Sequence, residues 1–562
     1  MAQRQLIECV PNFSEGRDMQ VIKEITDAIE RVAGVQLLDV DPGKATNRTV
    51  VTFVGEPEAV VEAAFQAIKK ASEVIDMSKH TGEHPRMGAT DVCPLIPIAG
   101  ITMDEVAKYA HKLAAKAGSE LGIPLYLYEN AATTPSRRNL ATVRAGEYEG
   151  LPEKLKDPKW KPDYGPAAFN ERAGATAIGA RDFLIAYNVN LNTTSVRRAN
   201  SVAFDIREKG RIKREGNKLT GKPLTDKKGN PLRTKGKCKS VKAIGWYIEE
   251  YKLAQISMNI TNINHTSLHK AFEECRKSAN RRGLRVTGSE LVGLVPKKVM
   301  TEAGRYFLQQ QNRSTGVSDE ELIHIAVKSL GLDELGPFDP QKKIIEYLLE
   351  GDDHKLVDMS LSAFASETAS ESPAPGGGSI SAYLGALGVS LGTMVANLSA
   401  NKRGWDDKVQ LYGDWAEQGQ AINKRLLHLV DEDTRAFTKI IEAVRLPKGT
   451  AEERKQRQLA MDRATEYAIE VPLQVMETAA SAFTMLKAMA REGNPNSVSD
   501  AGVGALACRA GIRGAYLNVK INCADYKNDK FVSKSLAKAE KLMKKAEKEE
   551  TQILKIVDKV IG

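Results

Sequence analysis

Cysteine is scarce in this sequence, and the cysteines that occur are far apart. Six cysteines are spread over 562 residues, and no two of them have the Cys-x-x-Cys spacing. Disulfide scaffolds and zinc ribbons need closely spaced cysteine pairs, so both classes are excluded. The opening residues, MAQRQLIECVPN, also lack the apolar stretch of a secretory signal peptide. We therefore expect a cytoplasmic protein with reduced thiols.

The composition excludes several non-globular classes. Hydrophobic residues make up 42% of the chain and charged residues 27%. These fractions are typical of a soluble globular protein and exclude a disordered chain, a collagen or a coiled-coil rod. At about 150 residues per domain, the length predicts three or four domains.

Positive charge is concentrated in one segment. Residues 207–242 hold 14 Lys and Arg but three Asp and Glu, while the whole chain has a net charge of +9. Such a patch can bind nucleic acid, a polyanionic ligand tail or an acidic partner, or can simply be a solvated loop. Five glycines and the lack of aromatic residues predict an exposed β-hairpin or excursion and disfavour nucleic-acid binding.

One long segment carries no charge at all. No charged residue occurs between Glu371 and Lys402, and residues 380–400 are long enough to cross a bilayer. The segment is, however, rich in Gly, Ser and Ala and contains Asn397. Its small residues recur every three or four positions, which lets helices approach closely: Ser381, Gly385, Gly388, Gly392 and Ala396. We predict a buried helix of a soluble bundle and no membrane span.

The hydrophobic pattern divides the chain into three folded parts. Residues 1–183 follow the order β-α-β-β-α-β-α-β, and residues 184–332 follow the ferredoxin-like order β-α-β-β-α-β around the basic excursion 207–242. A linker with Pro and Gly covers 333–356, and residues 357–562 show almost only helical periodicity. The predicted fold class is two α/β (ferredoxin-like, α+β) subdomains followed by an all-α helical bundle.

The densest polar cluster lies between a predicted helix and a predicted strand, at residues 76–94. His80 to His84 match the His-x-x-Glu-His spelling of an inverted zinc protease motif, which requires a helix. Gly82 inside the motif and Pro85 after it favour a loop, so we expect no metal. The alternatives are a general acid/base histidine on a loop and a histidine that is only hydrogen-bonded.

Two glycine-containing segments offer backbone amides to a ligand. Residues 163–183 form a loop of small residues without the Gly-x-Gly-x-x-Gly nucleotide pattern, so their signal is weak. PAPGGGSI, residues 373–380, stands directly before a helix, whose positive end suits an anion. It lacks the Gly-Lys-Ser/Thr ending of a P-loop, which makes ATP binding improbable. The glycines can also serve close helix packing.

An acidic motif, LVDEDTRAF at residues 429–437, lies within a predicted long helix. Asp431 and Asp433 are two positions apart, so they cannot share one helix face. An aspartate that faces the core would have a raised pKa and hold its proton near neutral pH. A solvated helix face is the alternative.

Long motifs identify a family to which this sequence is similar. The resemblance to formimidoyltransferase-cyclodeaminases is collinear over nearly the full length. In the α/β part it rests on ECVPNFSEG (8–16), LLDVD (37–41), TNRTVVTFVG (46–55), DMSKHTGEHPRMGATDVCP (76–94) and ATAIGARDFLIAYNVNL. In the helical part it rests on PAPGGGSISA, VDEDTRAF, LPKGTAEER and GAYLNVKIN.

The resemblance implies a bifunctional folate enzyme of histidine degradation without a metal. The first activity would transfer a formimino group from N-formimino-L-glutamate to N5 of the cosubstrate tetrahydrofolate. The second would cyclise 5-formimino-tetrahydrofolate to 5,10-methenyl-tetrahydrofolate and release ammonia. The alternative is a protein that keeps one activity and uses the other half as an oligomerisation scaffold. The resemblance also implies a homo-oligomer, namely a ring-like octamer.

The resemblance assigns roles to residues of both parts. Transfer needs a base for the N5 proton and an acid for the leaving glutamate nitrogen, and the family's catalytic histidine falls on His84. The proton donor for the departing ammonia falls on Asp433, with Asp431 as the fallback. The family's folate-binding segment falls on Gly165, Pro166, Ala167, Ala168, Phe169, Asn170, Glu171, Arg172, Ala173 and Gly174. Supporting positions are Asp39, His80, Arg86, Gly376, Gly377 and Gly378.

The basic segment 207–242 departs from the resemblance, because it is longer and more basic than expected. Folates often carry a polyglutamate tail, which is a polyanion. We therefore hypothesise that this segment holds the tail of polyglutamylated tetrahydrofolate.

Overall fold

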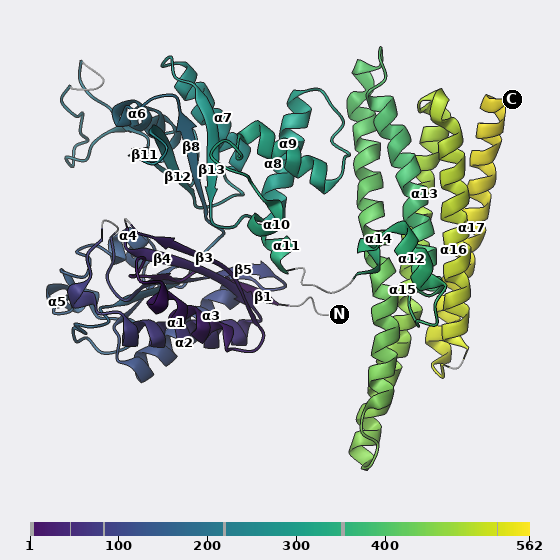
Figure 1. Ribbon diagram of the computed structural model, residues 1–562, viewed down its shortest axis with the longest axis horizontal. Coiled ribbons are helices and arrows are strands. Elements are labelled where there is room, and N and C mark those ends of the chain that lie inside the picture. The colour runs from purple at the N-terminus through teal and green to yellow at the C-terminus, as the bar shows by residue number, and fades with distance from the viewer. Residues whose placement is uncertain (1–4, 45, 83–84, 217–220, 350–354, 525) are drawn as a thin grey trace. The chain divides into compact units, whose positions relative to one another are not determined.

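The computed structural model describes residues 5–44, 46–82, 85–216, 221–349, 355–524 and 526–562 (Figure 1). The chain forms two compact units. The first consists of Met1–Met300 and Leu330–Gly351, and the second of Thr301–Ser329 and Asp352–Gly562. The predicted fold class is confirmed, because two α/β sheets are followed by a domain of long helices.

The first sheet of unit 1 is mixed. Strand β3 pairs with β4, β4 pairs with β1 and β2, these two pair with β5, and the parallel strands β7 and β6 complete the sheet. The strands are β1 (Leu6–Cys9), β2 (Asn12–Phe13), β3 (Val35–Gly43), β4 (Arg48–Gly55), β5 (Thr90–Ala99), β6 (Leu125–Glu129) and β7 (Thr176–Ala180). Short helices follow β6, namely η2 (Pro135–Arg137), α4 (Leu140–Val143), α5 (Leu151–Lys154) and η3 (Pro158–Trp160).

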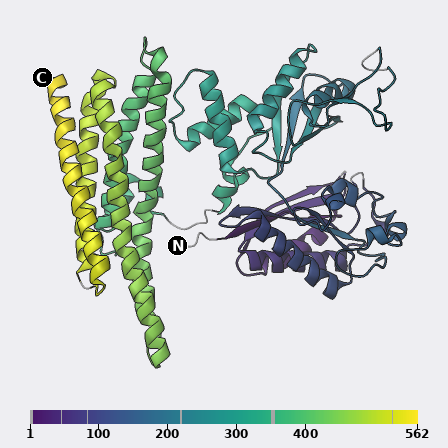
Figure 2. The same cartoon turned by 180° about the vertical axis from the view of Figure 1, so that it is seen from behind.

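Helices cover one face of this sheet, as Figures 1 and 2 show from opposite sides. They are α1 (Met19–Glu30), α2 (Pro57–Val74) and α3 (Met103–Leu121). Because successive side chains of a strand point to opposite faces, Ile7 and Cys9 of β1 enter the core under the helices. Glu8, between them, therefore points to the opposite face. That face carries the polar residues of the first candidate site.

The second sheet has the ferredoxin-like strand arrangement. Its order is β11-β12-β8-β13 and all neighbours are antiparallel. Its elements are β8 (Ile185–Leu191), α6 (Val196–Ile206), β11 (Val241–Ile248), β12 (Leu253–Ile260), α7 (Leu268–Asn280) and β13 (Val286–Val292). Helices α10 (Pro340–Lys343) and α11 (Ile345–Leu349) also belong to unit 1.

The basic segment forms the exposed hairpin that the sequence predicted. The two short strands β9 (Arg211–Ile212) and β10 (Arg233–Thr234) pair antiparallel, and residues 222–232 between them are exposed. Asp226 ties the tip, because its Oδ1 accepts hydrogen bonds from the backbone nitrogens of Lys228 and Asn230 at 2.8 and 2.9 Å. The lysines of the tip therefore stand in solvent on an ordered turn.

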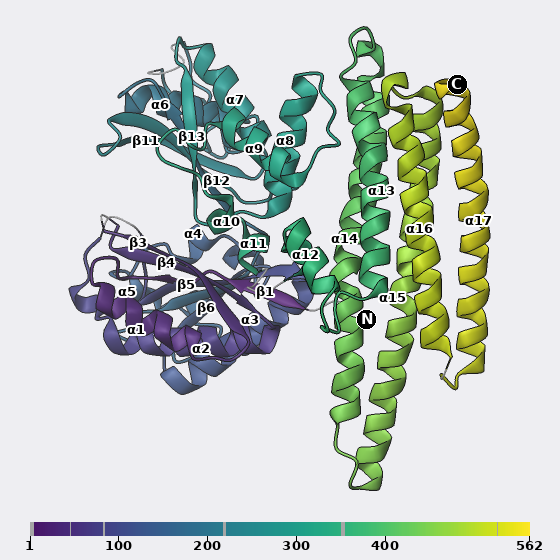
Figure 3. The same ribbon diagram turned by 45° about the vertical axis from the view of Figure 1, so that its right-hand side comes forward.

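Long helices build unit 2, as Figure 3 shows most clearly. They are α13 (Gly377–Ala400), α14 (Val409–Arg445), α15 (Ala451–Glu492), α16 (Val498–Cys523) and α17 (Asp529–Ile561), preceded by α12 (Leu361–Thr368) and the 3-10 turn η4 (Leu356–Asp358). Their facing apolar side chains form one core that includes Leu426, Ile469, Phe483 and Ile512. The predicted bundle is thus present.

Helix α13 is the predicted helix of small residues, and it packs inside the bundle. A Cβ added at Gly388 would lie 2.6 Å from the carbonyl oxygen of Gly504 and 2.6 Å from Cys508 Sγ. Among the described residues, α13 alone is long and apolar enough to cross a membrane, yet 61% of its apolar window is buried inside the protein. Close packing against α16 explains its composition.

Residues 301–329 join the helical unit, although the sequence places them in the second α/β subdomain. They contain most of α8 (Lys297–Gln310) and nearly all of α9 (Asp319–Leu330). The Ser314 hydroxyl donates to Asn397 Oδ1 at 2.6 Å, and Asn397 Nδ2 donates to the Gly316 carbonyl at 2.9 Å. These polar contacts with α13 could not be read from local periodicity.

Candidate functional site

The open face of the first sheet lines the first candidate site, a cavity of about 440 Å³ within unit 1. Strand alternation directs every second residue of β1 to β5 toward this cavity. Its polar lining includes Glu8, Asn12, Asp39, Asp41, Arg48, Tyr128, Arg144 and Arg181. The second sheet contributes Ala186, Asn259 and Val292. The cavity therefore combines carboxyl and guanidinium groups with apolar surface, as small-molecule sites commonly do.

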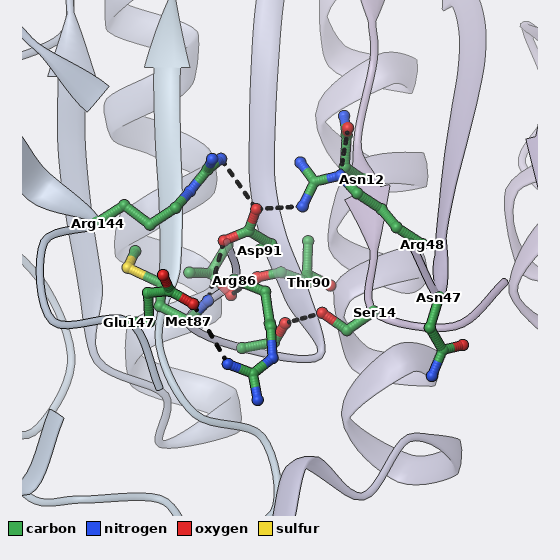
Figure 4. A network of polar contacts seen from close by, with 12 residues as sticks. Asn12, Ser14, Asn47, Arg48, Arg86, Met87, Thr90, Asp91, Arg144 and Glu147 are labelled. Atoms are coloured by element: carbon green, nitrogen blue, oxygen red, sulfur yellow. Dashed lines mark hydrogen bonds and ion pairs between the residues drawn. The ribbon is translucent and has the colours of Figure 1, made fainter. Parts of the chain in front are cut away.

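Two arginines of the cavity share one buried carboxylate, as Figure 4 shows. Asp91 is fully buried. Its Oδ2 accepts a hydrogen bond from Arg48 Nη1 and forms an ion pair with Arg144 Nη2 at 2.9 Å. Its Oδ1 accepts from the backbone nitrogen of Met87 at 3.0 Å. Two guanidinium groups against one carboxylate leave a net positive charge at the cavity wall, which suits a substrate carboxylate.

Glu8 and Asp39 are the cavity carboxyls whose pKa is perturbed. Burial raises the pKa of Glu8 to about 7, although the positive charge of Arg181 opposes this shift. Burial also raises the pKa of Asp39, and the neighbouring Asp41 adds to the increase while Lys343 opposes it. Asp39, a predicted supporting residue, thus lies in the cavity. Both carboxyls are candidates for proton transfer.

The predicted catalytic His84 lies outside the described residues, and so does Glu83. The described part of the loop contains one 3-10 turn, η1 (Met77–Lys79), and then runs extended at His80. This agrees with the loop that Gly82 and Pro85 predict. Among the residues that the structure describes, no three metal-ligating side chains come together.

His80 has both ring nitrogens engaged. Its Nδ1 accepts from Arg86 Nε at 3.2 Å, so Nε2 carries the hydrogen and donates to the Asn47 carbonyl at 3.0 Å. Burial lowers the pKa of His80, which keeps the ring neutral, and the bond to Asn47 partly offsets this shift. His80 therefore has a structural role in the loop that contains residues 77–82.

Arg86 connects the loop that follows η1 to Glu147 and Glu149. Its Nη2 donates to Glu149 Oε1 at 2.6 Å, and its Nη1 lies 3.4 Å from Glu147 Oε2. The side-chain hydrogen bond to Glu149 raises the pKa of Arg86. Figure 4 shows Arg86 and Glu147 beside the Asp91 network. Arg86 is thus a positioning residue for the loop that carries residue 84.

The structure brings together two clusters that are far apart in the sequence. The end of the segment Gly165–Gly174 lies beside Met77 and Ala89, because Met77 N donates to the Arg172 carbonyl at 3.0 Å and Ala89 N donates to the Ala173 carbonyl at 2.9 Å. A Cβ at Gly174 would lie 2.3 Å from the Met87 carbonyl oxygen, and its φ of +67° requires glycine. The Phe169 ring is exposed and lies 5.5 Å from the Tyr148 ring. This segment does not line the cavity described above.

The second candidate site lies at the beginning of α13. Asp433 of α14 accepts hydrogen bonds at Oδ2 from the Ser379 backbone nitrogen at 2.9 Å and from its hydroxyl at 3.2 Å. Burial raises the pKa of Asp433, and the two bonds from Ser379 partly offset the increase. A Cβ at Gly378 would lie 2.0 Å from Asp433 Oδ1. The protein's own carboxyl thus occupies the helix end that the sequence proposed for an anion.

Asp431 points elsewhere, as its two-residue separation from Asp433 requires. Its Oδ1 accepts from the Leu356 backbone nitrogen at 2.8 Å, so it fixes the turn η4. Burial raises its pKa, and the hydrogen bonds from Leu356 and Val357 oppose the increase. Of the other glycines in the run, Gly376 has open space around it and Gly377 faces the side-chain amide of Asn518.

The sequence interpretation did not single out Glu8, Arg48, Asp91 or Arg144. Glu8 is one acid inside the apolar strand LIEC, and such an isolated acid in a central strand is a usable signal. Asp91 was noted only as one member of the 76–94 cluster. Nothing in the sequence relates Arg48 or Arg144 to Asp91, because 43 and 53 positions separate them. The sheet brings Arg48 of β4 to Asp91 of β5, and the end of α4 brings Arg144 there.

Comparisons with known proteins identify the parts of the chain, and they include residues 301–329 in a formiminotransferase domain. Three family models match: the formiminotransferase domain, N-terminal subdomain, at residues 6–181, the formiminotransferase domain at 186–350, and formiminotransferase-cyclodeaminase at 360–541. A glutamate formimidoyltransferase of Streptococcus pyogenes is 43% identical over 308 residues, 55% of this chain and 95% of the relative. A methenyltetrahydrofolate cyclohydrolase of Methylorubrum extorquens is 32% identical over 187 residues, 33% of this chain and 90% of the relative.

Several relatives extend over both parts. The formimidoyltransferase-cyclodeaminase of Mus musculus is 44% identical over 552 residues, which are 98% of this chain and 98% of the relative. The match thus covers nearly the whole length of both proteins. The chain belongs to the formimidoyltransferase-cyclodeaminase family.

Proposed function

We propose that this protein is a bifunctional folate enzyme of histidine degradation. Its first activity transfers the formimino group of N-formimino-L-glutamate to N5 of tetrahydrofolate. Its second closes 5-formimino-tetrahydrofolate to 5,10-methenyl-tetrahydrofolate and releases ammonia. The observation that carries the proposal is the presence of two separately built sites, one in each compact unit. The chain matches its formimidoyltransferase-cyclodeaminase relative over 98% of its length.

The cavity of unit 1 has the charges that the transfer needs. N-formimino-L-glutamate is a dicarboxylate, and the excess positive charge of Arg48 and Arg144 over Asp91 supports binding of one of its carboxylates. N5 of tetrahydrofolate attacks the amidine carbon, and the glutamate nitrogen leaves with a proton. His84 is the proposed base, and the loop that carries it is fastened by Arg86 and His80.

The Asp433 site supports the cyclisation. N10 attacks the formimino carbon, and the departing nitrogen has to take up a proton to leave as ammonia. A buried carboxyl with a raised pKa can hold that proton near neutral pH. The amide and hydroxyl of Ser379 hold the carboxyl in one orientation, which such a transfer requires. Asp431 already accepts a bond from Leu356 and remains the fallback.

The folate is a cosubstrate of both reactions in this proposal, and no metal takes part. The exposed ring of Phe169 and the tight loop Gly165–Gly174 support folate binding beside the catalytic loop. All six cysteines are free and buried, which supports a reducing cytoplasmic location. We also propose a homo-oligomer, an octamer by family resemblance. Exposed Leu517 and Ile521 on α16 support self-association of the helical unit.

A turnover assay tests the proposal. The protein is mixed with N-formimino-L-glutamate and tetrahydrofolate, and glutamate, ammonia and methenyl-tetrahydrofolate are followed. His84→Ala should stop glutamate release but still deaminate supplied 5-formimino-tetrahydrofolate. Asp433→Asn should show the reverse. Glutamate without ammonia would mean that one activity is retained and the helical half is a scaffold, and no product at all would refute the function.

A further inference from the structure

We infer that Glu8 is a catalytic acid of the transferase site and protonates the leaving nitrogen of the formimino donor. The inference rests on the proposed transferase function. It concerns a residue of the central strand β1, which lies on the floor of the cavity and is far in sequence from the histidine loop.

The position of Glu8 in the sheet directs its side chain into the cavity. Glu8 pairs with Val54 of β4 on one side and with Ile96 of β5 on the other, so it occupies the middle of the sheet. Ile7 and Cys9, its neighbours in the strand, are buried under the helices of the opposite face. Glu8 therefore has to point toward the cavity, whose lining includes it.

The carboxyl of Glu8 lacks the partners that buried acids normally have. Glu8 is 2% exposed, and its Oε2 is buried without a hydrogen-bond partner among the described residues. An unpartnered buried carboxyl oxygen costs free energy, so its retention in the middle of a substrate cavity calls for an explanation. A substrate nitrogen that binds there would supply the missing partner.

The other acid/base groups of this region are committed to structural contacts. Asp91 is held by Arg48, Arg144 and the Met87 amide. His80 uses both ring nitrogens, one with Arg86 and one with Asn47. Among the described residues that line the cavity, Glu8 and Asp39 are thus the buried or half-buried acids outside that network, and Glu8 is the more deeply buried of the two.

The proposed step is balanced without any further reactant. The lone pair of N5 forms a bond to the amidine carbon, and the bond from that carbon to the glutamate nitrogen breaks with its electron pair going to nitrogen. The protonated carboxyl of Glu8 gives its proton to this nitrogen as it leaves. His84, the proposed base, takes the proton that N5 loses. That proton then passes to the Glu8 carboxylate, so the enzyme returns to its starting state. No oxidation or reduction occurs.

The charges that face Glu8 are consistent with a protonated carboxyl at neutral pH. Burial raises its pKa to about 7, against the opposing charge of Arg181. The remaining charged groups of the cavity wall are Asp39, Asp41, Arg48 and Arg144. The two guanidiniums beside Asp91 are partly neutralised by it. Glu8 can therefore serve as an acid at pH 7 and change its protonation within one turnover.

The test compares Glu8→Gln with the wild-type full-length chain in both assays. Glu8→Gln should lower kcat of glutamate release about 100-fold or more, with KM for tetrahydrofolate changed by less than about threefold. The wild-type transfer rate should fall as the pH rises through about 7, because Glu8 loses its proton there. The transfer rate of Glu8→Gln should not show this decrease. Deamination of supplied 5-formimino-tetrahydrofolate should not change. Glu129→Gln is the matched control, because Glu129 also has a pKa raised by burial but does not line the cavity.

The outcomes separate the inference from the function on which it rests. If the wild type transfers and Glu8→Gln keeps kcat, the inference is wrong and the proposed function stands. A higher KM with unchanged kcat would make Glu8 a folate-binding residue and would equally overturn the inference. If the wild type does not transfer, both are wrong. If Glu8→Gln does not fold, Glu8→Asp is measured instead. A shift in the pH at which the transfer rate decreases supports the inference, and an unchanged pH refutes it.

Discussion

The carboxyl of Asp433 closes the first turn of α13 by accepting hydrogen bonds from both the backbone nitrogen and the hydroxyl of Ser379, at 2.9 and 3.2 Å. The two residues are 54 positions apart and belong to different helices. The positive end of a helix favours the carboxylate form, whereas burial favours the neutral acid. Burial prevails, since the pKa of Asp433 is raised. The site therefore contains an acid that is held in one orientation at the N-terminus of α13.

Gly378 should be essential for the orientation of Asp433. A Cβ at this position would lie 2.0 Å from Asp433 Oδ1, so Gly378→Ala has to displace the carboxyl. We expect cyclodeaminase activity to fall about 100-fold, which is typical for a catalytic group misplaced by about 1 Å. Steady-state ammonia release from 5-formimino-tetrahydrofolate measures the effect.

The matched control is Gly413→Ala in α14, the helix that carries Asp433. A Cβ at Gly413 meets its nearest neighbour at 3.7 Å, an ordinary contact. This variant should keep its activity and gain up to about 1 kcal/mol of unfolding free energy from the better helix former. Equal activities of the two glycine variants would contradict the proposed importance of the Gly378 contact.

Asp91 should be the strongest single polar contributor to the stability of unit 1. Asp91→Asn leaves Arg48 and Arg144 beside each other without a counter-charge in a buried setting. We expect a loss of about 3–5 kcal/mol in the free energy of unfolding, as for other buried ion pairs that lose one partner. Urea unfolding followed by fluorescence measures it. Glu153→Gln, which removes the exposed pair with Lys156, should cost less than about 1 kcal/mol, and similar losses for both would disprove the assignment.

Local patterns were sufficient for the elements and for the general character of both sites. Apolar residues at helical spacing indicated the long helices, and the small residues of α13 indicated close packing, which Gly388 and Gly504 now explain. The two-residue spacing of Asp431 and Asp433 correctly separated their directions, one toward Leu356 and one toward Ser379. In each case the informative pattern is a residue spacing within one helix.

Long-range pairings could not be predicted in the same way. The anion expected at the start of α13 is a carboxyl of the chain itself, because α14 returns past that helix end. Likewise, Asp91 meets Arg48 only because β4 and β5 lie in one sheet on either side of β2. Glu8 faces the cavity because helices cover the other side of β1. These relationships depend on sheet order, which side-chain periodicity does not encode.

The raised pKa of Glu8 should make stability depend on pH. Burial raises the pKa of this carboxyl from 4.5 to about 7, so the folded state retains a proton that the unfolded state loses between these values. The free energy of unfolding should therefore decrease as the pH rises from about 4.5 through 7, by about 3 kcal/mol from this group. Glu8→Gln cannot lose the proton and should lack this contribution.

Urea unfolding at pH 5, 6, 7 and 8 measures the difference between the wild type and Glu8→Gln. The variant should gain relative stability with each step up to pH 8, because only the wild type acquires a buried charge. Subtracting the two curves removes the titration of all other groups that the substitution does not alter. A difference that stays constant from pH 5 to pH 8 would show that Glu8 titrates at an ordinary pKa in the folded protein.

The lysines of the basic hairpin should favour folates with long polyglutamate tails. Replacing four exposed lysines by Ser should raise KM for a polyglutamylated folate about three- to tenfold at low salt and leave KM for the monoglutamate unchanged, because only the longer tail brings several carboxylates to the hairpin. The replaced residues are Lys227, Lys228, Lys235 and Lys237.

A second quadruple variant separates local from overall charge. It changes four exposed lysines of α17 to Gln, namely Lys541, Lys544, Lys545 and Lys548, and so removes the same charge from the chain. If the hairpin holds the tail, only the hairpin variant loses the preference for polyglutamate, and its effect fades as salt is added. Equal effects of the hairpin variant on both folates, or equal effects of the two variants, would leave the hairpin as a solvated loop without a role in folate binding.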